Sequence, residues 1–333
     1  HLKKIYIIGD AIEEIENIEK EIEAISIFKN DIDKSGFLSD NYIGQKGCIK
    51  ENSVSAKGFD NKYIEDIVEK EKYIEKIRKL QEYIKEGHVY VANLTKTFVI
   101  KSNKKPYSVF CDLRRNNPSP FGAYINYGDF QIISSSPERF INIEDNKIET
   151  RPIKGTRKRG NNQEEDDILI EELKNKKKKK SELVMVVDLE RNDLNHICNR
   201  AGVEVTDLFK IETYATVHHL VAEIKGRLKD NWRFDEVMEA VFPGGSITGT
   251  PKIRAMEIIE ELEDAQRGIY TGSIGYIGFD RKIDLNIVIR TAVHQEGKYF
   301  IGSGGGITYD SDGEFEYEEV LQKASAIIEA VKE

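Results

Sequence analysis

Carboxylates on two predicted helices are the first residues that could carry chemistry. The final helix is predicted from about Phe315 to the end of the chain. Within it, Glu316, Glu319 and Lys323 follow helical spacing along the edge of an apolar stripe. Upstream, Glu182 opens another apolar helical stripe, where an unpaired carboxylate is costly. If the two helices face each other, their oxygen ligands suit Mg²⁺. The same residues can be explained without a metal. The helix dipole favours acidic residues in the first turn of the final helix, and Glu182 could be ion-paired.

Lys154 is a candidate nucleophile because of its neighbours. It lies in RPIKGTRKRG, after a predicted strand and an apolar residue and before Gly155. Partial desolvation at such a position lowers the pKa of a lysine and frees the lone pair of its amine. On these residues alone, a surface lysine in a basic turn is the simpler interpretation.

Glycine-rich segments could bind anions. GSGGG at 302–306 interrupts a strand pattern, where glycine marks close backbone approach, and its exposed N–H groups could bind a carboxylate. A flexible turn explains the same run. In FPGGSITGTPK, Thr250 is predicted as an N-cap and Pro251 as the first residue of a helix. The glycines and hydroxyls before them are typical of an anion-accepting loop at a helix start. His218 and His219, if helical, would point about 100° apart, and they show no metal-ligand spacing.

The elements that must position these residues follow from apolar periodicity. A long amphipathic helix is predicted from Ile64 to Gly87. Further helical patterns and strand alternations are found in the following segments: helices at 163–187 and 234–241, and strands at 89–100, 121–136, 139–153, 270–280, 282–293 and 298–310. Strand runs broken by helices indicate antiparallel sheets flanked by helices, which is the α+β class.

One predicted strand is central to the site. In KIDLNIVIRTAV, the alternation places Ile283 and Ile289 on the apolar face and Arg290 on the polar face. A short hairpin connection, Glu296–Gly297–Lys298, then leads to the glycine-rich strand.

Composition narrows the class of protein. The 333 residues allow one large domain or two smaller ones, and 39% apolar with 33% charged residues indicates a globular chain. A net charge of -9 argues against wrapping nucleic acid or anionic membrane, and no apolar run approaches membrane-spanning length. Cys48, Cys111 and Cys198 are widely spaced and fit no metal or disulfide pattern, which favours a reduced, cytoplasmic setting.

Ten segments, in order, resemble the chorismate-utilising enzymes, a family that includes anthranilate, aminodeoxychorismate, isochorismate and salicylate synthases. The resemblance implies two antiparallel sheets packed as a sandwich with helices on the outside. We expect residues 1–62 to be the remnant of an N-terminal region, because the chain starts at His1 and not at Met, and residues 63–333 to be the chorismate-binding catalytic domain. The segments are NPSPFGAYI, SSSPERF, ETRPIKGTRKRG, SELVMVVDLERND, YATVHHLV, FPGGSITGTPKIRAMEII, RGIYTGSIGYIGFD, LNIVIRT, GSGGGI and EFEYEEVLQKA.

Within the family, the lysine of PIKGT resembles the aminodeoxychorismate synthases, because anthranilate synthases usually carry alanine there. The resemblance implies that the Lys154 amine adds at C2 of chorismate while the C4 hydroxyl leaves, and that ammonia then adds at C4 and expels the lysine. Glu138 of SPERF would be the general acid that protonates the leaving hydroxyl. Ammonia would come from a glutamine amidotransferase subunit, and the product, 4-amino-4-deoxychorismate, would serve para-aminobenzoate and folate biosynthesis.

The resemblance also assigns the remaining roles. Glu182 and Glu319 would hold Mg²⁺, with Glu316 as an outer acidic partner, and the metal would neutralise charge near the attacked carbon. The substrate-binding residues would be Tyr270 and Arg290 with N–H groups of Gly304, Gly305 and Gly306 at the enolpyruvyl carboxylate, His219 and Ser246 at the ring carboxylate, and Lys323 near the metal-bound waters.

The sequence departs from the family pattern at two positions. Lys179 stands three residues before Glu182, where many relatives have a second acidic residue, and this affects an outer contact of the metal. Thr250 replaces a common alanine beside the pocket.

Other functions remain open on the sequence. A related synthase would make anthranilate, isochorismate or salicylate from the same substrate. A non-catalytic chorismate-binding homologue would keep the fold without the chemistry. Nucleic-acid binding through Lys176–Lys180 is disfavoured by the acidic balance of the chain.

Overall fold

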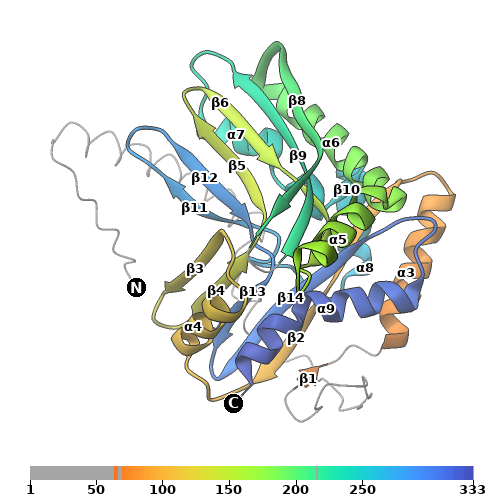
Figure 1. Cartoon of the computed structure of the whole chain (residues 1–333), viewed down its shortest axis with the longest axis vertical. Helices are drawn as coiled ribbons and strands as arrows, with labels where there is room; N and C mark the ends of the chain where they lie inside the picture. The colour runs from red at the N-terminus through yellow and green to blue at the C-terminus, as the bar shows by residue number, and fades with distance from the viewer. Residues whose placement is uncertain (1–63, 67–69, 215–216, 333) are drawn as a thin grey trace.

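The computed structural model describes residues 64–66, 70–214 and 217–332. The predicted N-terminal remnant, residues 1–62, and Cys48 lie outside this part of the chain. Figure 1 shows two sheets that spread apart at one end of the molecule, with helices packed against each.

The first sheet is antiparallel in the order β1-β2-β14-β13-β4-β3, with β10 beside β2. Its strands are β1 (Ile64–Asp66), β2 (Val91–Lys101), β3 (Phe121–Asn126), β4 (Gln131–Ser136), β10 (Gly249–Thr250), β13 (Thr291–Gln295) and β14 (Lys298–Ile307). The β13–β14 connection is a hairpin where one was predicted, but its loop is two residues and not three: Gln295 pairs with Lys298, and both loop residues have positive φ.

The second sheet is antiparallel in the order β11-β12-β5-β6-β9-β7, with β8 beside β9. Its strands are β5 (Arg139–Glu144), β6 (Lys147–Arg151), β7 (Ile153–Lys158), β8 (Cys198–Thr213), β9 (Val217–Leu228), β11 (Ser273–Ile277) and β12 (Ile283–Ile287). The strands β8 and β9 were not predicted. Because His218 and His219 lie in β9, they point to opposite faces of a sheet, and the helical geometry considered for them is wrong.

Helices cover one face of each sheet and bury an apolar core there. Residues of α3, α4, α8 and α9 pack with those of β2, β13 and β14 in one core, and residues of α6 and α7 pack with those of β5, β9 and β12 in the other. The predicted α+β class with two antiparallel sheets is therefore confirmed. The helices are α3 (Lys70–Lys85), α4 (Pro106–Asn116), α5 (Gln163–Asn175), α6 (Lys177–Ile197), α7 (Phe234–Val241), the 3₁₀ turn η2 (Gly245–Ile247), α8 (Lys252–Leu262) and α9 (Gly313–Val331).

Local signals set several of these helix starts. The side chain of Asn162 caps α5 by accepting a hydrogen bond from the N–H of Glu165 (2.9 Å), and Asp312 caps α9 in the same way through Phe315 (2.8 Å). Pro106 occupies the first turn of α4, where its missing N–H has no intrahelical partner to lose.

Three boundaries differ from the predictions. The helix predicted from Ile64 begins at Lys70, and Ile64–Asp66 instead pairs with β2. The helical run at 163–187 is two helices that meet at Lys176, and the second continues to Ile197. Thr250 belongs to β10 and Pro251 precedes α8 as its N-cap residue, so α8 begins one residue later than predicted.

The fourth difference matters most for the site. The strand predicted at 282–293 is two strands, β12 in the second sheet and β13 in the first. Arg290 lies in the crossing between them with φ of 48°, a left-handed conformation that ends regular pairing. It is therefore not on the polar face of a strand, as the alternation predicted.

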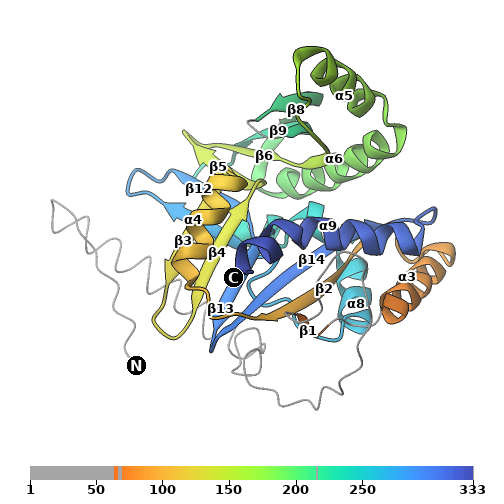
Figure 2. The ribbon, with the colours of Figure 1, turned by 60° about the horizontal axis from the view of Figure 1, so that its bottom comes forward.

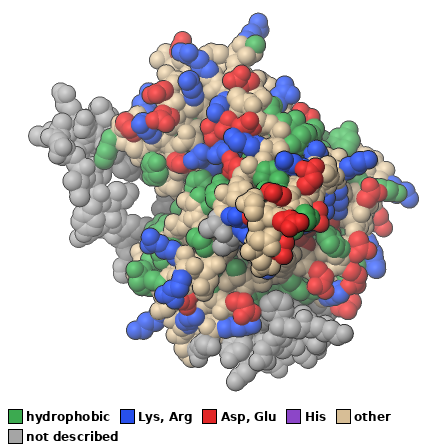
Figure 3. Space-filling view, in the orientation of Figure 1, with side chains coloured by type: hydrophobic (Ala, Val, Ile, Leu, Met, Phe, Trp, Pro, Cys, Tyr) green, Lys and Arg blue, Asp and Glu red, His purple; other side chains and the backbone are tan. Residues whose placement is uncertain are grey.

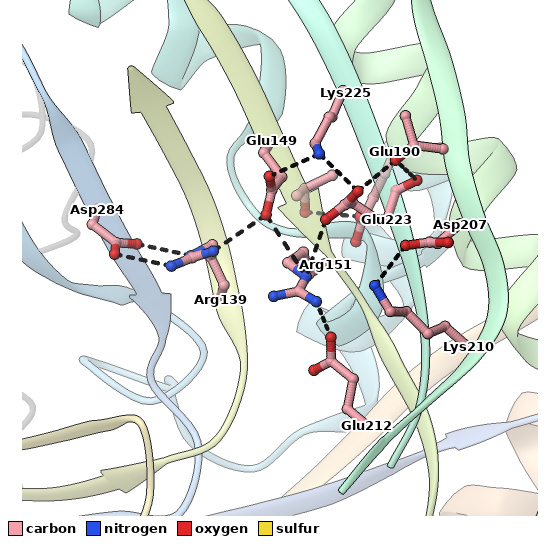
Figure 4. A network of polar contacts seen from close by, with 12 residues as sticks. Arg139, Glu149, Arg151, Glu190, Asp207, Lys210, Glu212, Glu223, Lys225 and Asp284 are labelled. Atoms are coloured by element: carbon pink, nitrogen blue, oxygen red, sulfur yellow. Dashed lines mark hydrogen bonds and ion pairs between the residues drawn. The ribbon is translucent and has the colours of Figure 1, made fainter.

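The outer face of the second sheet carries a network of ion pairs (Figure 4). Arg139 contacts Asp284 and Glu149, while Arg151 contacts Glu149 and Glu212. Acidic and basic side chains also intermix across the face seen in Figure 3. Among the described residues, no helix is long and apolar enough to cross a membrane.

Candidate active site

Lys154 owes its position to a bulge in β7. Ile153 pairs with Val221 and Thr156 with His219, so three steps along β7 oppose two along β9. The extra residue is absorbed at Lys154–Gly155, where Gly155 has φ of 112°, a conformation open mainly to glycine. Bulges of this kind redirect side chains. Here the Lys154 Nζ donates a hydrogen bond to the carbonyl oxygen of Ser246 at 3.1 Å.

The environment of Lys154 matches what an amine nucleophile needs. Burial lowers its pKa, and Glu138 opposes this by favouring the charged form. The charges of Glu182 and Lys323 also affect the pKa of this amine. Several residues predicted for the site are therefore near Lys154. A surface lysine in a basic turn, the simpler interpretation of the sequence, does not describe this side chain.

Glu138 lies where the chain crosses from β4 of the first sheet to β5 of the second. Its carbonyl accepts a hydrogen bond from Ile287 N (3.0 Å), which fixes this crossing beside the end of β12. The side chain is 6% exposed, and burial raises its pKa while Lys154 acts in the opposite direction. A raised carboxyl pKa beside a lowered amine pKa is the pairing expected of a general acid and a nucleophile.

Two buried polar atoms in this region have no hydrogen-bond partner among the described residues. They are Oε1 of Glu138 and Oγ of Ser246. The two side chains are close enough that Ser246 lowers the pKa of Glu138. Because buried polar atoms are nearly always fully paired in folded proteins, their incomplete pairing leaves hydrogen-bonding capacity for a ligand or water. Ser246 lies in η2, and the carbonyl of the same residue holds Lys154.

His219 reaches the same region from β9. Its Nδ1 is 2.9 Å from the hydroxyl of Thr156, directly opposite in the sheet, which fixes the ring. Burial and the neighbouring Arg290 lower its pKa to about 4, so the imidazole is neutral near pH 7. His218, on the other face of β9, contacts Asp166 of α5 at 2.9 Å and does not join the site.

Arg290 lies on the second crossing between the sheets, residues 288–290, and Tyr270 lies just before β11, next to Thr271, whose N–H donates a hydrogen bond to the carbonyl of Val288 in that crossing (2.8 Å). The carbonyl of Arg290 accepts a hydrogen bond from Ser135 N (3.0 Å). The guanidinium makes no hydrogen bond or ion pair with another described residue, burial lowers its pKa, and Glu138 favours its charge. Tyr270 is half-buried against the glycine strand: a Cβ at Gly302 would lie 2.2 Å from the tyrosine ring. A free arginine of this kind suits bidentate carboxylate binding.

The register of β14 shows in which direction the N–H group of each predicted glycine points. Thr95 N bonds to Glu263 and Asn93 N to Thr248, both away from β14, and these two residues oppose Gly304 and Gly306. Directly opposed residues exchange both bonds or neither, so the N–H groups of Gly304 and Gly306 face the open edge beyond the end of β13. The N–H of Gly305 faces β2 instead. Its bare Cα leaves room for Glu316 and Lys323, which a Cβ would meet at 3.5 and 3.7 Å.

The first turn of α6 approaches the first turns of α9 (Figure 2), and a carboxylate from each helix reaches the same lysine. The Lys179 Nζ lies 2.9 Å from Oε2 of Glu182 and 3.9 Å from Oε2 of Glu319. The other oxygen of Glu319 is 2.8 Å from Lys323 Nζ, which also donates to the carbonyl of Gly304. Burial opposes ionisation of Glu319, but Lys323 and Lys179 outweigh it and lower its pKa to about 2.

The donor set fits a hard divalent cation in chemistry. Glu182 and Glu319 both reach the same ammonium group, so one cation can contact both, and carboxylate oxygen is the ligand Mg²⁺ prefers. Among the described residues, no three acidic, histidine or cysteine side chains already stand close enough together to hold a metal. The position between the carboxylates is instead held by lysine.

The sequence did not single out Glu190. It is 7% exposed, accepts a hydrogen bond from the hydroxyl of Thr150 at 2.9 Å, and lines a small cavity with Asp193 and Gly245. The sequence does contain an indication of its burial, because Glu190 lies on the apolar stripe of α6 between Val187 and Leu194.

Comparisons with known proteins all point to one enzyme family. The family described as chorismate binding enzyme matches residues 2–329. Aminodeoxychorismate synthase component 1 of Bacillus subtilis is 43% identical over 256 residues, which are 77% of this chain and 54% of that protein. Anthranilate synthase component 1 of Aquifex aeolicus is 41% identical over 263 residues, which are 79% of this chain and 53% of that protein. The chain thus spans about half the length of these curated relatives.

A solved structure agrees. Anthranilate synthase component I from Streptococcus pneumoniae superimposes with a TM-score of 0.74 at 29% identity, covering 98% of this chain and 69% of that chain.

Proposed function

This chain belongs to the chorismate-binding enzymes, and from that premise we propose that it aminates chorismate at C4, as component 1 of an aminodeoxychorismate synthase. Ammonia would be supplied by a glutamine amidotransferase subunit, as the name component 1 of several relatives suggests. The product would be 4-amino-4-deoxychorismate, a precursor of para-aminobenzoate and folate.

The observation that carries the proposal is the amine of the half-buried Lys154 side chain. It is held by a backbone carbonyl, its pKa is lowered by burial, and Glu138 stands near it with a raised pKa. A neutral amine can attack carbon, whereas an ammonium group cannot. An enzyme that used water or ammonia directly at C2 would have no need of a lysine at this point.

The chemistry balances with these two residues. The Lys154 nitrogen bonds to C2, both ring double bonds shift so that C1=C2 and C5=C6 become C1=C6 and C4=C5, and the C4–O bond breaks while Glu138 donates its proton to form water. Ammonia then bonds to C4, both double bonds shift back, and the C2–N bond to Lys154 breaks. The proton lost by the incoming ammonia returns to Glu138, which restores both groups.

The other residues would hold the substrate. Arg290, whose guanidinium has no partner among the described residues, would bind one carboxylate, together with the N–H groups of Gly304 and Gly306 and the Tyr270 hydroxyl. The orphan Ser246 hydroxyl and neutral His219 would line the ring-carboxylate side. Mg²⁺ held by Glu182 and Glu319, with Glu316 as an outer acidic partner, would neutralise charge near the attacked carbon.

Product analysis tests the proposal. The protein is incubated with chorismate, Mg²⁺ and ammonium, and the products are separated by chromatography. We expect 4-amino-4-deoxychorismate, a Lys154→Ala variant that loses about 100-fold or more in rate, and a Lys158→Ala control at the wild-type rate, because Lys158 is exposed at the end of the same strand. Mass spectrometry should find a chorismate-derived adduct on the Lys154 peptide.

Anthranilate formation is the second candidate, because relatives named anthranilate synthase match this chain at nearly the same identity. The same assay separates the two. Anthranilate as the product, or a Lys154→Ala variant that aminates C4 at the wild-type rate, would refute the covalent role of Lys154. A protein that binds no chorismate at all would point to a homologue without this chemistry.

A further inference from the structure

Three ammonium groups already neutralise the acidic site. Lys178 lies 3.5 Å from Glu316, Lys179 contacts Glu182 and Glu319, and Lys323 lies 2.8 Å from Glu319. The three carboxylates are thus matched by three lysines, two of them from the first turn of α6. A divalent cation entering this arrangement meets like charges at short range.

Lys179 differs from the other two by its position. It is the one of the three lysines whose Nζ approaches both carboxylates predicted to coordinate the metal, at 2.9 Å and 3.9 Å. Among the residues that the structure describes, Lys178 and Lys323 each contact a single acidic side chain, and Lys323 is also anchored to the carbonyl of Gly304. The Lys179 ammonium therefore occupies the space where a cation shared by Glu182 and Glu319 must sit.

We propose that Lys179 is the resident counter-cation of this site, and that Mg²⁺ binds only by displacing it. The inference rests on the metal site of the proposed function. The lysine can leave without unfolding α6, because its side chain is 21% exposed and so has a path to solvent. Metal affinity of the free protein is lowered by the cost of breaking both lysine contacts, and a variant without the charge binds Mg²⁺ more tightly.

Calorimetric titration of Mg²⁺ into the protein without chorismate tests this directly. Lys179→Met keeps the aliphatic stem and removes the charge, so its Kd should fall about tenfold, equivalent to about 1.4 kcal/mol. Lys179→Arg keeps the charge and should stay within about twofold of the wild type. Lys177→Met is the matched control: it removes a positive charge from an exposed position on the same turn, and its Kd should also stay within about twofold.

Several results would overturn the proposal. Lys179→Met binding Mg²⁺ no more tightly than the wild type would show that the lysine does not compete. An equal gain in Lys177→Met would reduce the effect to general surface charge. Should Lys179→Met fail to fold by circular dichroism, Lys179→Gln replaces it with the same expected gain.

Failure of the Lys179 proposal can be distinguished from failure of the proposed function. If no variant binds Mg²⁺, the carboxylates are not a metal site and the Lys179 proposal falls. Amination at C4 is measured separately by product analysis. If the titration gives the expected order while the product is anthranilate, Lys179 keeps its role and only the assignment of Lys154 fails.

Discussion

Glu190 is a buried acid that the proposed reaction does not use. Burial, together with the nearby charge of Glu138, raises its pKa to about 8, from 4.5 when the group is free in solution. A carboxyl group whose pKa is raised by folding binds its proton more tightly in the folded state. Its contribution therefore favours folding at low pH and is lost as the pH rises from about 4.5 to about 8.

Glu190→Gln should remove this dependence. Glutamine keeps the shape and the contact with Thr150 but cannot ionise. The unfolding free energy of the variant, relative to the wild type, should rise by up to about 1.4 kcal/mol per pH unit between pH 5 and pH 8. Urea titrations at both ends of that range measure it, with Glu239→Gln, an exposed acid on α7, as the control. Parallel pH dependence in Glu190→Gln and wild type would contradict the assignment.

Single residues differ in how far the sequence reveals them. Lys154 and Glu138 could be chosen because they lie in segments that resemble a known family. Glu190 lies on an apolar stripe that is visible in the sequence, but its partner Thr150 is 40 residues away and on another element. Local periodicity carries no information about such a contact, so the sequence could not say whether the acid was satisfied, exposed or functional.

Among the elements, the bulge in β7 sets the geometry of the nucleophile. Gly155 combines a φ of 112° with close packing, since a Cβ there would lie 3.0 Å from Leu173. Without the bulge, the alternation of the strand would send Lys154 in another direction. The glycine is therefore required by conformation and by space.

Gly155→Ala should lose both stability and activity. Backbone strain of this kind costs about 1–3 kcal/mol, measured as a lower unfolding free energy in urea. The matched control is Gly128→Ala, which has φ of 86° but no atom within 4 Å of the added Cβ. Both variants should be destabilised, but only Gly155→Ala should lose amination. Normal activity in Gly155→Ala would show that Lys154 does not depend on the bulge.

Element boundaries were predicted wrongly from the sequence where tertiary structure overrides a local pattern. Residues 283–287 alternate, and the alternation continues at Ile289 and Arg290 with only Val288 out of pattern, yet the chain leaves the second sheet after Ile287 and enters the first at Thr291. The change depends on the left-handed backbone at Arg290, which arginine rarely adopts and no propensity predicts. The hairpin at 296–297 was predictable because its turn chemistry is local.

On the scale of the whole molecule, the candidate site lies where the chain passes between the two sheets. Glu138 follows β4 of the first sheet and precedes β5 of the second, while Arg290 lies on the return crossing. Hydrogen bonds from Ile287 to Glu138 and from Ser135 to Arg290 tie the crossings to the sheet ends. Each sheet has its own buried core, so a ligand at this junction would join two separately packed halves.

Substrate binding should therefore slow hydrogen exchange in both halves at once. With chorismate and Mg²⁺ in ammonia-free buffer, at about 100 times Kd, the folded state gains about 2.7 kcal/mol. Protection should rise in β7 and β9 of the second sheet and in β14 and the first turns of α9. Helix α4, near the opposite end of α9 (Figure 1), is the internal control.

Arg290→Gln tests whether the junction is responsible. The change removes the charge for the substrate carboxylate, so protection should fall in both halves together, since one ligand holds both. Protection confined to one sheet in the wild type would instead mean that the ligand contacts only one core. The crossings would then be structural connections, and Glu138 and Arg290 would lie beside the binding site without forming it.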